Sequence, residues 1–194
     1  MAKQLGFFVN SQRCIWCRTC EMACKDKNDN EKGVRFRRVL IFEGGKYPEP
    51  YAYALSLACN HCVKPTCVPV CPVGALEKRE KDGIVVYHYD KCIGCRRCEW
   101  SCPYGAPQWN AGDKKMKKCD FCHDYIDQGK PPACVASCIT RALEFGEMEE
   151  LEKLPDSDKE AAGFADIKLT KPSIIFRLHP EGKVKKQGEE KVKS

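Results

Sequence analysis

Sixteen cysteines, arranged as four groups of four, constrain this protein more than any other feature of its sequence. The third group lies in KCIGCRRCEWSCP, where the spacing is C-x2-C-x2-C-x3-C and a proline follows. The first group has the same spacing, the second and fourth lengthen one internal gap, and all four end in x3-C. The groups are Cys14, Cys17, Cys20 and Cys24; Cys59, Cys62, Cys67 and Cys71; Cys92, Cys95, Cys98 and Cys102; and Cys119, Cys122, Cys134 and Cys138. A repeat of this kind sets the architecture of the whole chain.

Three chemistries use thiols in such numbers: disulfides, structural zinc and iron–sulfur clusters. Disulfides are disfavoured because neighbouring C-x2-C pairs bridge distant segments poorly, and because MAKQLGFFVNSQRC lacks the apolar stretch of a secretory signal. Zinc prefers two separated C-x2-C pairs around one ion, which leaves the third and the offset fourth cysteine unexplained. The run C-x2-C-x2-C-x3-C-P is the signature of two-cluster ferredoxins, in which the fourth cysteine binds the other cluster.

Sixteen thiolates, at four per cubane, predict four 4Fe–4S clusters whose irons are held by all sixteen cysteines. Groups two and three are close in sequence and are natural partners, which leaves groups one and four to pair across them. Exchange of the fourth cysteine then predicts a first set of Cys14, Cys17, Cys20 and Cys138; a second of Cys119, Cys122, Cys134 and Cys24; a third of Cys59, Cys62, Cys67 and Cys102; and a fourth of Cys92, Cys95, Cys98 and Cys71. Spacing alone leaves open the other pairing, of group one with two and of three with four.

The expected fold is α+β, with two ferredoxin-like units of two 4Fe–4S clusters each, one nested inside the other. Residues 1–50 and 111–146 form the outer unit and carry groups one and four. Residues 51–110 form the inserted unit and carry groups two and three. Residues 147–194 form a C-terminal extension and tail, and we expect the extension to bind a partner.

Short apolar stretches on either side of the cysteine groups predict strands, with short helices beginning inside each x3 gap. The flanking strands are expected in GFFVNSQRC, GALEKRE, GIVVYHYDKC and RALEFGE. Further strands are expected over Phe36–Phe42 and in PSIIFRL, and a helical turn or two in MEELEKL. The last stretch, HPEGKVKKQGEEKVKS, is expected to be a disordered tail.

The formal net charge of +6 counts the cysteines as neutral. Each oxidised 4Fe–4S site carries about −2 with its four thiolates, so four sites bring the loaded chain to about −2. The basic excess, including KKMKK at 114–118, therefore indicates solvated or cluster-compensating charge rather than nucleic-acid binding. We expect His61 not to be a ligand, because the cysteines already complete the sites, and Trp16 and Trp100 to pack against clusters.

Sites ligated entirely by cysteine leave no open position for a substrate, and the sequence shows no nucleophile–base constellation and no phosphate-binding loop. The chain is therefore expected to transfer single electrons and not to be catalytic alone. Four such centres in one small chain predict a relay that needs a donor and an acceptor from other chains.

The chain resembles the iron–sulfur subunit of DMSO reductase-type molybdopterin oxidoreductases, a four-cluster family. The matching stretches are GFFVNSQRCIWCRTCEMACKD, CNHCVKPTCVPVCPVGAL, KREKDGIVVYHYDKCIGCRRCEWSCPYGAPQWN, KKCDFCHDYIDQGKPPACVASC and RALEFG. They cover most of residues 5–146, and KPSIIF at 171–176 resembles the family's last strand. The resemblance implies the nested pairing, and an order of clusters running from the first set beside the catalytic subunit to the fourth beside the membrane subunit.

Two positions bear on that resemblance. Cys138 is followed by Ile139, where proline is common in relatives. In the nitrate reductase branch a tryptophan replaces a cysteine of the third group and leaves a three-iron cluster, whereas Cys95 retains the cysteine here. We therefore expect four complete cubanes.

The partners that the resemblance implies are a molybdopterin catalytic subunit, with molybdenum or tungsten, and a membrane anchor with a quinone site. The chain has no stretch of about 20 apolar residues, so no membrane span of its own is expected. The complex is expected at the extracytoplasmic face, exported folded with its partner; a cytoplasmic complex is the alternative. The alternative functions are a free-standing polyferredoxin or hydrogenase partner, and a zinc-stapled interaction or nucleic-acid module.

Metal analysis of the natively purified protein tests the choice of metal. We expect about 16 iron and about 16 acid-labile sulfide per chain with little zinc, since each cubane carries four of each. About two to four zinc ions per chain without sulfide would contradict the iron–sulfur interpretation.

Overall fold

The computed structural model describes residues 3–184, and its short strands and helices agree with the predicted mixture of the two. The strands are β1 Leu5–Asn10, β2 Arg38–Lys46, β3 Glu49–Leu57, β4 Leu76–Lys78, β5 Val85–Tyr87, β6 Gln108–Asn110, β7 Lys115–Lys117, β8 Leu143–Glu147 and β9 Ile174–Arg177. The α-helices are α1 Thr19–Lys27, α2 Arg97–Ser101, α3 His123–Ile126, α4 Ala133–Ala136 and α5 Met148–Leu151, and the 3-10 helices are η1 Tyr89–Lys91 and η2 Pro180–Gly182.

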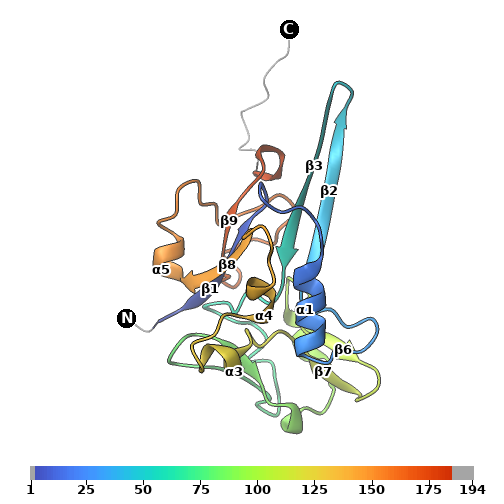
Figure 1. Cartoon of the computed structure of the whole chain (residues 1–194). Coiled ribbons are helices and arrows are strands. Elements are labelled where there is room, and N and C mark those ends of the chain that lie inside the picture. The colour runs from blue at the N-terminus through green and yellow to red at the C-terminus, as the bar shows by residue number, and fades with distance from the viewer. Residues whose placement is uncertain (1–2, 185–194) are drawn as a thin grey trace.

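The three-stranded sheet joins the two ends of the described chain, with β1 between β8 and β9 (Figure 1). β1 pairs antiparallel with β8, with Val9 opposite Leu143, and parallel with β9, with Phe7 opposite Ile174. All six residues of β1 are buried, as a central strand requires. The strand that precedes group one therefore lies beside the strand that follows group four.

A second pairing joins the strands between groups two and three. β4 and β5 form an antiparallel hairpin in which Leu76 lies opposite Tyr87 and Lys78 opposite Val85. The predicted strands on both sides of this connection are confirmed. A third hairpin, β6–β7, joins group three to group four, with Trp109 opposite Met116.

The longest hairpin, β2–β3, projects away from the other elements (Figure 1). The strand expected over Phe36–Phe42 begins at Arg38 and continues to Lys46. Gly45 takes a φ of +78° near the turn, where a side chain would also meet the backbone of Glu49. The expected boundary after residue 50 falls inside β3, so this hairpin connects the two expected units.

The helices begin earlier than the sequence predicts. α1 and α2 each start one residue before the third cysteine of their group, not inside the x3 gap. The residues before them, Arg18 and Arg96, have φ values of 58° and 61°, which turn the cysteine loop directly into the helix. Group two forms turns instead of a helix, because Pro69 lies in its x3 gap and cannot donate a helical hydrogen bond.

The C-terminal extension returns to the main sheet. The predicted helical turn and last strand are confirmed as α5 and β9. The start of the expected disordered tail is ordered instead, because the His179 side chain accepts a hydrogen bond from the backbone of Glu181 and Gly182 is buried beside Tyr53. Residues 185–194 of that predicted tail lie outside the described residues.

Cysteines and aromatic side chains share the core. The largest buried cluster contains Phe7, Phe121 and Phe176 together with Cys20 and Cys24. The rings of Phe7 and Phe121 stack with their centroids 4.2 Å apart. Nine buried cysteines therefore share the interior with the apolar side chains that hold the elements together. No helix in residues 3–184 has the length and apolarity that crossing a bilayer requires.

Truncating Phe7 tests the importance of this small aromatic core. Phe7→Ala should cost about 3–5 kcal/mol and lower the Tm of the iron-loaded protein by about 6–20 °C. The matched control is Tyr47→Ala, since Tyr47 is 95% exposed at the tip of the long hairpin and should shift the Tm by no more than about 2 °C. Equal shifts for the two variants would contradict this description of the core.

Candidate iron–sulfur sites

Each of the sixteen cysteines is a free thiol, and nine of them are buried. Within residues 3–184, no three histidine, cysteine or carboxylate side chains converge closely enough to hold a single metal ion. The thiols instead surround larger spaces, two of which are lined by complete predicted sets.

The four cysteines of the first set line one cavity: Cys14, Cys17, Cys20 and Cys138. Pairing of β1 with β8 explains how a cysteine from group four reaches group one, since Cys14 follows β1 and Cys138 precedes β8. Burial raises the pKa of the Cys14 thiol, and the charges of Cys138 and Cys17 raise it as well.

The second set forms around α1 and α4, which pack against each other (Figure 1). Cys24 lies one turn after Cys20 on α1, outside the lining of the first cavity. Burial, and after it the charge of Cys134, raises the pKa of Cys24 to about 12, and Cys122 acts in the same direction. Burial raises the pKa of Cys119 well above the usual range of a thiol, and Cys24 is the next cause. Cys24 therefore lies with the three group-four cysteines of its predicted set.

The third set lines a second cavity, together with Lys118: Cys59, Cys62, Cys67 and Cys102. Cys102 comes from group three and reaches this cavity from the end of α2. Burial raises the pKa values of Cys62 and Cys67 to about 12 each. Cys102 of group three thus lines the same cavity as three cysteines of group two, as the predicted exchange requires.

The fourth set lies around the β4–β5 hairpin. Burial, followed by the charges of Cys92 and Cys95, raises the pKa of Cys98 to about 11. Cys71 and Cys92 pack against the same buried apolar cluster, which contains Cys98. The Cys71 sulfur accepts a hydrogen bond from the backbone N–H of Ala75 at 3.2 Å.

The sets differ in depth. All four cysteines of the second set are buried, and so are three of the third. In the first and fourth sets a single cysteine is buried, Cys20 and Cys98 respectively. The first and fourth sets therefore lie nearer the surface than the two sets between them.

One loop geometry recurs in all four groups. The residue before the second cysteine has a positive φ in each: Trp16 at 62°, His61 at 43°, Gly94 at 71° and Phe121 at 64°. Only one of these residues is glycine, so the sequence does not reveal the shared conformation. Successive N–H groups in such turns point into a common concavity that favours anions, including iron–sulfur clusters.

The same turns bring backbone N–H groups to sulfur. The N–H of Gly94 donates to the Cys92 sulfur at 3.4 Å, and that of Phe121 donates to the Cys119 sulfur at 3.4 Å. Donors of this kind stabilise a thiolate and tune the potential of a bound cluster. The donor set therefore fits a 4Fe–4S group, because the thiols are grouped in fours and backbone N–H groups are aimed at sulfur.

His61 plays a structural part. It is fully buried, its Nδ1 accepts a hydrogen bond from the backbone N–H of Val85 at 3.0 Å, and its ring meets the edge of Phe121. Burial lowers its pKa well below the usual range, so the ring is neutral. Trp16 packs against the main core, but the prediction for Trp100 is wrong, because its position on α2 leaves the side chain exposed.

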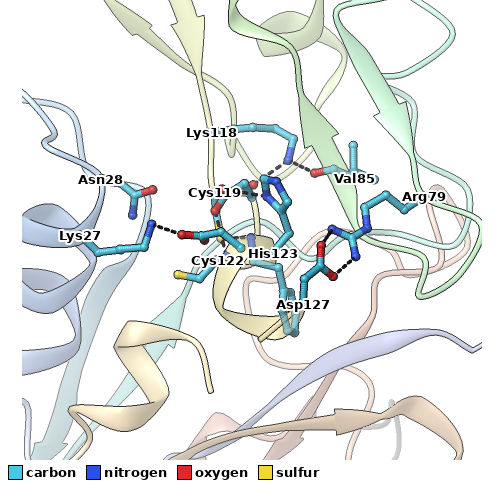
Figure 2. A network of polar contacts seen from close by, with 12 residues as sticks. Lys27, Asn28, Arg79, Val85, Lys118, Cys119, Cys122, His123 and Asp127 are labelled. Atoms are coloured by element: carbon cyan, nitrogen blue, oxygen red, sulfur yellow. Dashed lines mark hydrogen bonds and ion pairs between the residues drawn. The ribbon is translucent and has the colours of Figure 1, made fainter. Parts of the chain in front are cut away.

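The sequence does not reveal three side chains that lie near the thiols. Ser56, on β3, lines the first cavity, and its hydroxyl lies 3.3 Å from the Cys20 sulfur. Arg37 is buried beside Ser56. Lys118 is buried at the third set, close to Cys119 and Val85 (Figure 2). Lys118 belongs to the KKMKK run, and its place next to Cys119 in the sequence is the one signal that could have singled it out.

Most of this chain aligns with known proteins. Residues 51–148 match the model of the 4Fe–4S dicluster domain. The chain is 47% identical over 185 residues to the B component of the anaerobic dimethyl sulfoxide reductase of Escherichia coli strain K12, a match that covers 91% of this chain and 90% of that one. It is 39% identical over 184 residues to the component of the same name from Haemophilus influenzae, covering 90% and 89%. It is 39% identical over 176 residues to the B component of the sulfite dehydrogenase of Allochromatium vinosum, covering 80% and 72%.

Replacing Cys24 tests the exchange between groups one and four. Cys24→Ser should remove or alter the cluster held by Cys119, Cys122 and Cys134, because Cys24 lies with these thiols and not in the first cavity. EPR of the reduced protein measures the loss cluster by cluster. Met22→Ser is the matched control, since Met22 is exposed on the same helix. Loss confined to the cluster of Cys14, Cys17 and Cys20 would refute the exchange.

Proposed function

Because this protein belongs to the iron–sulfur, electron-transfer subunits of DMSO reductase-type oxidoreductases, we propose that it relays single electrons through four 4Fe–4S clusters between a membrane quinol or quinone subunit and a molybdopterin catalytic subunit. A chain of this family is one subunit of a multi-subunit reductase and is not catalytic alone. The substrate is that of the catalytic partner.

The observation that carries the proposal is the exchange of a fourth cysteine between groups. Cys138 shares a cavity with three cysteines of group one, and Cys102 shares one with three cysteines of group two. Exchange of this kind is the hallmark of paired cubanes in ferredoxins. It supports the predicted sets as the ligands of four 4Fe–4S clusters, and it favours pairing group one with four over pairing it with two.

Bound 4Fe–4S clusters with complete cysteine ligation supply one-electron exchange and no site for substrate. The chain buries seven of the eight cysteines of the second and third sets, and backbone N–H groups donate to the sulfurs of Cys119 in the second set and Cys92 in the fourth. The contact between α1 and α4 brings the first and second sets together, and Lys118 lies between the second and third. These close approaches support a continuous row through the first three sites.

We also propose that the chain is divided into two nested units. Pairing of β1 with β8 supports an outer unit of residues 1–50 and 111–146, and the β4–β5 hairpin supports an inserted unit of residues 51–110. The β2–β3 hairpin ties the two units across residue 50. The extension over residues 147–194 supplies β9 to the outer unit's sheet and is also proposed to contact a partner.

Exposed apolar side chains lie beside the first and the fourth sets, where partners must approach. Ile15 and Ile139 flank Cys14 and Cys138, and Ile93 and Trp100 flank the fourth set. Such patches mark protein interaction sites on soluble surfaces. We assign the first set to the molybdopterin subunit and the fourth set to the membrane anchor with its quinone site, on the extracytoplasmic face after export with a folded partner.

Purification of the native complex tests the proposed partnership. We expect the protein to copurify with a large pterin-containing polypeptide and a membrane subunit, and its clusters to be reduced by a quinol analogue within one turnover of the catalytic subunit. A protein that purifies alone and exchanges electrons with soluble ferredoxin partners would instead identify a free-standing polyferredoxin or a hydrogenase partner.

Substitution of Cys95 tests the ligation of the fourth set. Cys95→Trp should convert one cubane into a three-iron cluster of higher reduction potential, because one iron loses its thiolate. EPR of the oxidised protein detects the three-iron signal. The neighbouring Ile93→Trp, at an exposed position, is the control that should leave four cubanes. An unchanged spectrum for Cys95→Trp would remove Cys95 from the ligands.

A further inference from the structure

Two cationic side chains are buried in the protein, Arg37 at 1% exposure and Lys118 at 4%, and no other lysine or arginine among residues 3–184 is buried. Removing a cation from water is costly unless negative charge compensates it. Among charged groups, cysteine thiolates rather than carboxylates act most strongly on both side chains. The negative charge of the cysteine sites therefore compensates the burial of these two cations.

Arg37 contacts residues of two sets. Its guanidinium donates to the backbone oxygen of Ser56 at 3.0 Å and to its hydroxyl at 3.3 Å, and that hydroxyl lies 3.3 Å from the first-set sulfur of Cys20. Arg37 also acts on the second-set thiol of Cys24, where its charge and its backbone favour the thiolate against the larger effect of burial on the pKa. Its Nε and Nη2 are buried without a hydrogen-bond partner in the described part of the chain. These unsatisfied donors indicate a further acceptor beside Arg37.

Lys118 lies between the second and third sets in the same way. Its ammonium donates to the backbone oxygens of Val85 and of the second-set residue Cys119, both at 2.6 Å (Figure 2). The same side chain lines the cavity formed by the third-set cysteines. A lysine ammonium has three N–H donors, so one is left after the two carbonyl contacts.

We propose that Arg37 and Lys118 raise the reduction potentials of the clusters beside them. Arg37 acts on the first and second clusters, and Lys118 acts on the second and third. This role depends on the proposed function, because it requires the four clusters to be bound. The second cluster borders both cations, so its reduction potential should respond to substitution of either one.

The direction follows from charge. Reduction adds an electron to a site that already carries about −2, so a cation beside it stabilises the reduced form. A buried cation is little screened by salt, whereas surface charges are largely screened. Arginine keeps its charge in proteins, and the ammonium of Lys118 is held by two carbonyl acceptors that favour the protonated form.

The fourth set provides an internal reference. The cations near its cysteines, Arg96 and Lys115, are not buried, so solvent screens them. The contacts of Arg37 and Lys118 involve residues of the first three sets, so cluster four should respond to neither substitution. If Arg37 or Lys118 only stabilised the fold, its substitution would not shift the reduction potentials of just the two clusters beside it.

Redox titration of the complete purified complex, followed by EPR, tests the proposal. Arg37→Gln should lower the potentials of clusters one and two, and Lys118→Gln those of clusters two and three. Each shift should correspond to about a tenfold weaker reduction, or about 59 mV for one electron. Lys159→Gln, which removes an exposed cation paired with Glu152, is the control that should shift none. Equal shifts in all four clusters, or no shift in any, would overturn the proposal.

Charge-preserving variants separate electrostatics from folding. Arg37→Lys and Lys118→Arg should load iron fully and keep potentials close to those of the unaltered complex. If the glutamine variants load little iron, restored loading in the charge-preserving pair supports the proposal, and failure to restore it counts against the role of charge. An unaltered complex without about 16 iron per chain would refute the proposed function itself, whereas full loading with unmoved potentials would refute this inference alone.

Discussion

The offset of the fourth cysteine governs this structure. In each group the fourth cysteine follows the third after three residues, and we propose that it serves a different site from the first three, as Cys24 does one helical turn after Cys20. With such an exchange no group completes its own site, so the proposed ligation requires distant groups to meet. The pairing of β1 with β8 and the contact of α1 with α4 satisfy that requirement for groups one and four. Cysteine sites then occupy interior volume that apolar side chains fill in other small proteins.

Much of this arrangement could be predicted from spacing and alternation. Strands β1, β4, β5, β8 and β9 were expected because short apolar stretches lead into or out of the cysteine groups. Helix starts were misplaced, because they depend on left-handed backbone at Arg18 and Arg96, which arginine rarely adopts and sequence does not announce. The order at Pro180–Gly182 was missed because it depends on tertiary contact between Gly182 and Tyr53.

The limits of sequence reasoning are clearest for side chains whose role depends on burial. Lys118 closes a run of lysines that resembles ordinary surface charge, yet folding places it between two cysteine sets. Arg37 follows no motif and is brought to Ser56 only by pairing of β2 with β3. Trp100 is the opposite case, because this large aromatic residue between two cysteines is exposed although its sequence position suggested burial. Cysteine spacing predicts which thiols meet, whereas the charges around them become visible only in three dimensions.

Anomalous diffraction at the iron absorption edge, measured on crystals of the native complex, tests the central claim most directly. We expect four compact iron peaks in this protein, with Cys138 at the peak beside Cys14 and Cys102 at the peak beside Cys59. Fewer peaks, or a peak surrounded by all four cysteines of a single group, would contradict it.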